Sequence, residues 1–297
     1  MNLTRFALLF FIYASFIAVQ AQANLQCVDL FSAKTYKTTE FTIHISGKKQ
    51  SDRYLTKAHE ILVANSDPAV AFMILDRISE FGVKSLTGEQ RQFIFKFRQN
   101  SSFMRSIFQT SDQKHLSPAK FARFVKDFGV LKDMLLIEQD AQAEAIAAHI
   151  LKKYEDLDFQ KLLKKSEPAS KKSVALYFIG IVQHTKEIMR KSIMTVDEVH
   201  DVRKHLRDVL RFLQMEQQIR EEDGLENLES LNRAVVFLRK TNASLGEVCD
   251  GYAARMLSDE ALGNPFPLTK KTLVQFPIEI RPRVEHFLNF YHLEVGD

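Results

Sequence analysis

The chain has 297 residues, of which 45% are hydrophobic and 26% charged, a composition typical of a globular protein. Its 41 basic and 37 acidic residues leave a net charge of only +4, which excludes a polyanion-binding role carried by the field of the whole molecule. Ten Gly and seven Pro favour long helices over many short strands.

Residues 1–23 have the features of a secretory signal peptide. Arg5 gives a positive start, and residues 6–19 form an apolar run that is short for a membrane helix. Small residues at the −3 and −1 positions predict cleavage near Ala21 or Ala23, and hence a periplasmic or secreted protein. An uncleaved N-terminal anchor is the alternative. No later apolar run is long enough for a membrane helix, so we expect no stable membrane span.

The next segment, 24–51, is predicted to be an N-terminal arm with strand-like alternation between Tyr36 and Ser46. From Ser51 onward the pattern is helical almost throughout. Within this helical region the sequence marks four helix starts and one polar break between helices. The starts are the N-cap and N1 pairs Asp67-Pro68 and Ser117-Pro118 and the capping boxes Thr87–Gln90 and Thr195–Glu198, and the break is Glu167–Lys172.

Two sequence features that recur in the second part of the chain indicate an internal repeat. The capping box at Thr87 recurs at Thr195, and the hexamer Phe128–Asp133 resembles Leu245–Asp250 at a similar spacing downstream. We therefore predict an all-α fold of two related helical halves. Their boundaries are 52–165 and 173–297. The residues shared by the hexamers are Gly129 and Gly246, Asp133 and Asp250.

The segment 199–213 has two helical faces. One face is apolar, and the other carries four cations and a histidine with no carboxylate among them. These residues are His200, Arg203, Lys204, Arg207 and Arg211. A solvated helix face usually pairs opposite charges at i,i+4, so this stripe is either an anion site or an unpaired basic surface.

The pattern His200-x-x-Arg203-x-x-x-Arg207 resembles the first motif of the CHAD family, the conserved histidine α-helical domain. The family's second motif, a Leu-Gly-x-x-Arg-Asp turn that opens a later helix, resembles Leu245–Asp250, with Cys249 in place of Arg. The match covers about residues 173–262. The resemblance implies two helical bundles facing a central basic groove, and inorganic polyphosphate as the ligand.

This chain departs from the family pattern in its first half. Ungapped alignment on the capping threonines places Gln92, Phe95 and Gln99 opposite the motif, and a shift by one places Arg91, Ile94 and Arg98 there. Neither register gives His-x-x-Arg. We therefore predict a one-sided groove, with cations only from the second half. The Phe-rich helix 90–108 is expected to serve as core or as a protein-docking face.

Further cations are candidates to extend the site: Lys186 and Arg190 on the preceding helix, and Arg239 on the following one. Each is alternatively a solvated surface residue. His200 either contacts the ligand or donates to a backbone carbonyl. Asp133 and Asp250 either cap a helix start or orient arginines across the bundle. The two cysteines, Cys27 and Cys249, either form a disulfide or remain thiols.

Signatures of enzymes are absent from the sequence. It has no phosphate-binding Gly-rich loop, no Gly-x-Ser-x-Gly and no His-Glu-x-x-His, and its histidine spacings suit no metal on one helix face. We expect a binding protein without catalytic residues, metal or cofactor, whose partner is polyphosphate or another phosphate-rich polyanion and not nucleic acid. The alternatives are a helical module that docks a protein partner, and a phosphate-ester enzyme that uses His200 as acid or base.

Overall fold

The computed structural model describes residues 39–45, 47–225, 228–261, 263–264 and 266–295. The chain divides into two units, residues 1–39 and 40–297, and the helices and strands described below belong to the second. The expected signal peptide, most of the arm and Cys27 lie outside the described residues. Within the described part, no helix is long and apolar enough to cross a membrane.

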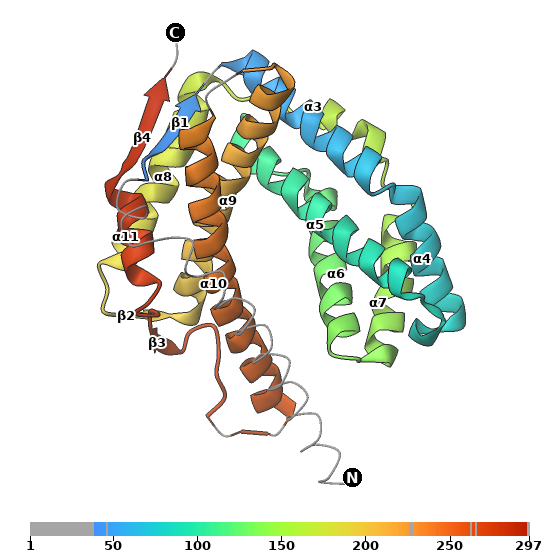
Figure 1. Cartoon of the computed structure of the whole chain (residues 1–297). Helices are drawn as coiled ribbons and strands as arrows, with labels where there is room; N and C mark the ends of the chain where they lie inside the picture. The colour runs from blue at the N-terminus through green and yellow to red at the C-terminus, as the bar shows by residue number, and fades with distance from the viewer. Residues whose placement is uncertain (1–38, 46, 226–227, 262, 265, 296–297) are drawn as a thin grey trace. The chain divides into compact units, whose positions relative to one another are not determined.

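The fold is all-α, as predicted, with two small sheets (Figure 1). Long α-helices follow one another through most of the second unit, and a short one lies near its end. Their bounds are α3 Lys48–Asn65, α4 Pro68–Phe81, α5 Gly88–Ser111, α6 Ala119–Leu136, α7 Asp140–Tyr154, α8 Lys171–Met189, α9 Val196–Glu222, α10 Glu229–Ala261 and α11 Arg281–Asn289. Short 3₁₀ turns lie at Val83–Ser85, Phe159–Lys161 and Leu163–Lys165.

Both predicted capping boxes are confirmed. The hydroxyl of Thr87 accepts from the backbone N–H of Gln90, and that of Thr195 accepts from the backbone N–H of Glu198. In return, the side chains of Gln90 and Glu198 accept from the backbone N–H groups of Thr87 and Thr195. Asp67 caps α4 as expected. The prediction for α6 is wrong by one residue, since Pro118 and not Ser117 holds the N-cap position and no side chain caps the helix.

The segment with strand-like alternation near the N-terminus forms β1, Phe41–Ile45, which pairs in parallel with β4, Tyr291–Val295. A second ribbon joins β2, Ile193–Thr195, to β3, Leu273–Gln275, in antiparallel register. Strands β2, β3 and β4 were not predicted, because such short strands next to helices give little periodic signal.

Helical hairpins organise the contacts. Helix α5 packs against α3, α6 and α9, and α9 packs against α10, α8 and α5. The two predicted halves meet where α5 packs against α9 and α8 and where α3 packs against α9. Figure 1 shows α9 and α10 running side by side as one hairpin, and α6 beside α7 as another.

Phenylalanine rings fill the core, and the Phe-rich helix α5 belongs to it. Phe97 and Phe108 are fully buried, and the ring of Phe97 meets those of Phe124, Phe128 and Phe159 at centroid distances of 6.0, 4.9 and 6.2 Å. Each fully buried Phe contributes on the order of 1.5–3 kcal/mol. Phe93, Phe95 and Phe103 on the same helix are only half-buried, so Phe97 and Phe108 belong to the core while the other three rings keep part of their surface exposed.

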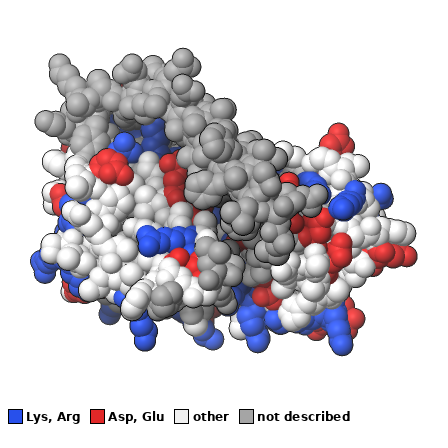
Figure 2. All heavy atoms as spheres, turned by 90° about the horizontal axis from the view of Figure 1, so that it is seen from below, with Lys and Arg blue, Asp and Glu red and all other residues white. Residues whose placement is uncertain are grey.

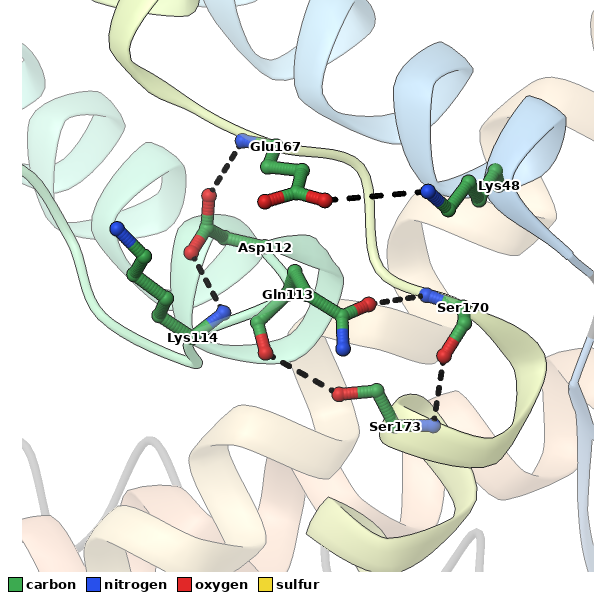
Figure 3. A network of polar contacts seen from close by, with 7 residues as sticks. All are labelled: Lys48, Asp112, Gln113, Lys114, Glu167, Ser170 and Ser173. Carbon is green, nitrogen blue, oxygen red and sulfur yellow. Dashed lines mark hydrogen bonds and ion pairs between the residues drawn. The ribbon is translucent and has the colours of Figure 1, made fainter.

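The predicted polar break at 167–172 is confirmed in position, with α8 beginning at Lys171 after the N-cap Ser170. It is nevertheless firmly attached to the end of α5 (Figure 3). Asp112 accepts from the backbone N–H of Glu167 at 2.8 Å, and Gln113 accepts from that of Ser170 at 2.8 Å. These bonds fix where α8 starts relative to α5.

Candidate functional site

The basic stripe of α9 lies where α9 meets α5. Val199, Val202 and Leu206 are fully buried, which turns the adjacent side of this helix, with Arg203 and Arg207, toward partly buried positions. The capping box at Thr195 sets the first turn, and the apolar stripe sets the rotation of the helix about its axis. These two sequence features place the arginines.

Two arginines of the first half join them. Arg98 and Arg105 lie about two turns apart on α5 and therefore on one face. Burial, and then the charges of Arg105, Arg207 and Arg203, lower the pKa of Arg98 to about 10. We name Arg98, Arg105, Arg203, Arg207 and Arg211 the arginine cluster. The prediction of a one-sided site is wrong, since both halves supply cations.

The cluster brings like charges together at half-buried positions. Burial lowers the pKa of Arg207, and Arg105 and Arg203 act in the same direction. Burial also holds the pKa of Arg211 well below its ordinary value, with Arg207, Arg98 and Arg105 adding to the effect. Like charges held together in this way favour an anion among them.

Four of the five guanidinium groups have an unused donor. The Nε atoms of Arg98, Arg105, Arg203 and Arg207 are buried and have no hydrogen-bond partner within the described protein. Leaving a buried charged donor unpaired costs on the order of 1–3 kcal/mol, and an acceptor placed among these groups would remove that cost.

Arg211 differs from the other four. Its Nη1 donates to the carbonyl of Ser102 and to the hydroxyl of Ser106, at 2.7 Å for the latter. The expectation that Arg211 shares an open groove with Arg203 and Arg207 is wrong, because Arg211 is hydrogen-bonded to Ser102 and Ser106 of α5 and so links α9 to α5.

Each half places one arginine over a glycine. A Cβ on Gly129 would lie 3.1 Å from Nε of Arg98, and a Cβ on Gly246 would lie 3.1 Å from Nη2 of Arg203. The aspartate one helical turn later is also near. Asp250 Oδ1 lies 3.3 Å from Nη1 of Arg203, and the charge of Asp133 acts to raise the pKa of Arg98. The glycines therefore make room for the two arginines.

This geometry corrects the expected role of the hexamers. Gly129 and Asp133 lie within α6, and Gly246, Cys249 and Asp250 lie within α10, so neither hexamer opens a helix and neither aspartate caps one. Asp250 is instead a partner of Arg203, which is the alternative role that the sequence left open. Cys249 is buried and forms no disulfide with any described residue, and Cys27, its partner in the possible disulfide, is outside the described residues.

The remaining predicted residues divide into two groups. His200 is an exposed residue on the same stripe of α9, and desolvation, then the charges of Arg203, Lys204 and Arg207, lower its pKa. Lys204 is engaged by Asp201 at 2.7 Å, so the stripe is less free of carboxylates than its sequence indicates. Lys186, Arg190 and Arg239 are exposed, and no contact among the described residues brings them to the cluster.

On the face shown in Figure 2, basic and acidic side chains are interspersed and do not gather into one basic field. The described residues contain no group of three or more His, Cys, Asp or Glu side chains suited to a metal ion.

Comparison of the chain with family models, with curated proteins and with solved structures found no match in any of the three.

Proposed function

We propose that the protein binds polyphosphate, or another polyanion rich in phosphate groups, at the arginine cluster. The observation that carries the proposal is the set of four buried, unpartnered Nε atoms on α5 and α9. Arginine forks meet phosphate oxygens with charge-assisted hydrogen bonds, which are about twice as strong as neutral ones.

The resemblance to the CHAD family supports the same ligand. Arg98 over Gly129 and Arg203 over Gly246 supply a two-sided arrangement of cations, as the resemblance implies. We propose on this basis that the halves are an internal repeat. The proposed role is binding without catalysis, and His200 then contributes a donor whose charge depends on pH.

A binding assay with long-chain polyphosphate tests the proposal. Arg203→Gln and Arg207→Gln are each expected to weaken binding by about 1.5–3 kcal/mol, the value of a hydrogen bond to a charged group. Lys161→Glu is the matched control, because Lys161 is an exposed residue paired with Asp158 on a short turn. If Lys161→Glu weakens binding as much as the arginine variants do, the site is wrong.

A further inference from the structure

One buried carboxylate stands within the arginine cluster. Asp208 is 4% exposed and follows Arg207 on α9. Its Oδ1 accepts from the hydroxyl of Ser106 at 2.7 Å, and its Oδ2 accepts from the hydroxyl of Tyr177 at 3.2 Å. Its charge acts to raise the pKa values of Arg207 and Arg211, and a carboxylate so close to the proposed anion site repels a fully ionised ligand.

The hydrogen bonds around Asp208 show that its neighbours donate to it and that it accepts. The hydroxyl of Ser106 accepts from Nη1 of Arg211, so its own hydrogen is directed to Asp208. Tyr177 is held in turn by the ring of His115, which stacks on it with the ring centroids 4.7 Å apart. Asp208 is therefore an acceptor fixed by three helices, α5, α8 and α9. A carboxylate has about four lone-pair sites, so capacity remains for one more donor.

We propose that Asp208 makes the cluster selective for phosphate groups that still carry a hydrogen, such as inorganic phosphate, protonated phosphate monoesters and the protonated ends of polyphosphate chains. This inference rests on the proposed function and names the part of the ligand that the site recognises.

The distance between Arg207 and Asp208 supports it. The unpartnered Nε of Arg207 lies 3.9 Å from Oδ1 of Asp208. Because the two atoms are this close, a ligand oxygen that accepts from Nε at about 2.9 Å can at the same time lie within hydrogen-bond distance of Oδ1. A bare anionic oxygen is repelled there, whereas a P–OH group on the same ligand donates to Asp208.

Ligand chemistry then separates otherwise similar anions. Inorganic phosphate keeps at least one hydrogen at neutral pH, whereas a phosphate monoester loses its last one with a pKa of about 6. Sulfate carries none. Sites built around a hydrogen bond reject analogues that lack the matching group far more strongly than sites built on shape alone.

The test is competition of inorganic phosphate and of sulfate against labelled long-chain polyphosphate at neutral pH and equal ionic strength. For the unmodified protein we expect phosphate to compete at least about tenfold better than sulfate. Asp208→Asn should bring the ratio of the two affinities close to one, because the amide can donate to sulfate. Asp250→Asn is the matched control, since Asp250 is an exposed carboxylate beside Arg203 and its loss should strengthen both anions equally.

The outcomes are distinguishable. Equal competition by phosphate and sulfate, or a ratio that Asp250→Asn changes as much as Asp208→Asn does, overturns the selectivity but leaves polyanion binding standing. Failure of labelled polyphosphate to bind overturns the proposed function itself. If Asp208→Asn does not fold, the phosphate-to-sulfate ratio of the unmodified protein decides alone.

Discussion

The guanidinium group of Arg203 lies against the backbone of Gly246, where an added Cβ would stand 3.1 Å from Nη2. The two residues are far apart in the sequence and come from the two arms of the α9–α10 hairpin. The same relation holds between Arg98 and Gly129 in the α5–α6 hairpin.

Gly246→Ala should separate stability from binding. Alanine is better than glycine inside a helix by about 1 kcal/mol, and the contact that it creates is with the movable end of Arg203, so the melting temperature should hold or rise. The displaced guanidinium should weaken polyphosphate binding by about threefold to tenfold.

The control is Gly180→Ala on α8, which has open space around its Cβ position. It should change the melting temperature in the same direction and leave binding unaltered. A Gly246→Ala protein that binds as well as the unmodified one would show that the position of Arg203 does not matter.

Arg98→Gln should weaken polyphosphate binding as much as Arg203→Gln does, by about 1.5–3 kcal/mol, because the two arginines occupy matching positions. Lys96→Gln, an exposed neighbour on the same helix, is the control. Calorimetric titration of the three variants measures this. Full affinity in Arg98→Gln would restore the one-sided site that the sequence predicts.

The position of Arg98 along its helix explains why the sequence did not reveal it. Arg98 lies about one helical turn further from the capping residue Thr87 than Arg203 lies from Thr195. An ungapped alignment on the capping boxes therefore cannot place the two arginines opposite each other. Only the packing of α6 on α5 and of α10 on α9 shows that each arginine faces a glycine.

Other features were predictable because their signals are local. The helix starts at Thr87 and Thr195, the break before α8 and the all-α class all follow from capping and periodicity. The burial of Arg211 by Ser102 and Ser106 does not, because it depends on how α5 crosses α9. The two glycines were recognisable as a repeated sequence feature. That each of them makes room for an arginine follows only from how the helices pack.

His200 should titrate below its ordinary value of 6.5, because desolvation and the charges of Arg203, Lys204 and Arg207 lower its pKa. A bound polyanion should raise that pKa, so binding takes up protons at mildly acidic pH. His200→Ala should then cost less affinity at pH 8 than at pH 6. NMR titration of the ring, free and bound, reports both effects, and a pKa unmoved by ligand would place His200 outside the site.

Glu216 should make the protein less stable as pH rises. Burial raises its pKa from 4.5 to about 7, and its Oε2 has no hydrogen-bond partner, although Nη2 of Arg220 lies 2.7 Å from Oε1. The folded protein therefore holds a proton that the unfolded chain releases near pH 4.5. The stabilisation is fully present below pH 4.5 and is lost as pH rises through 7, with an upper bound of about 3 kcal/mol.

Glu216→Gln removes this dependence and should raise the free energy of unfolding at pH 8 by about 1–3 kcal/mol relative to the unmodified protein. Glu222→Gln is the control, since Glu222 is an exposed residue at the end of the same helix and pairs with Lys57. Urea unfolding at pH 5 and pH 8 measures the difference. An equal effect of Glu216→Gln at both values would mean that this carboxyl does not titrate as described.

The most direct test of the central claim is the salt dependence of polyphosphate binding. Neutralising about four phosphates releases their counterions, so log Kobs should fall with log salt at a slope of roughly −3, using the single-strand coefficient. Arg98→Gln and Arg203→Gln should each flatten that slope by somewhat under one unit. No binding of the unmodified protein at low salt, or a slope near zero that neither arginine variant changes, would contradict the account.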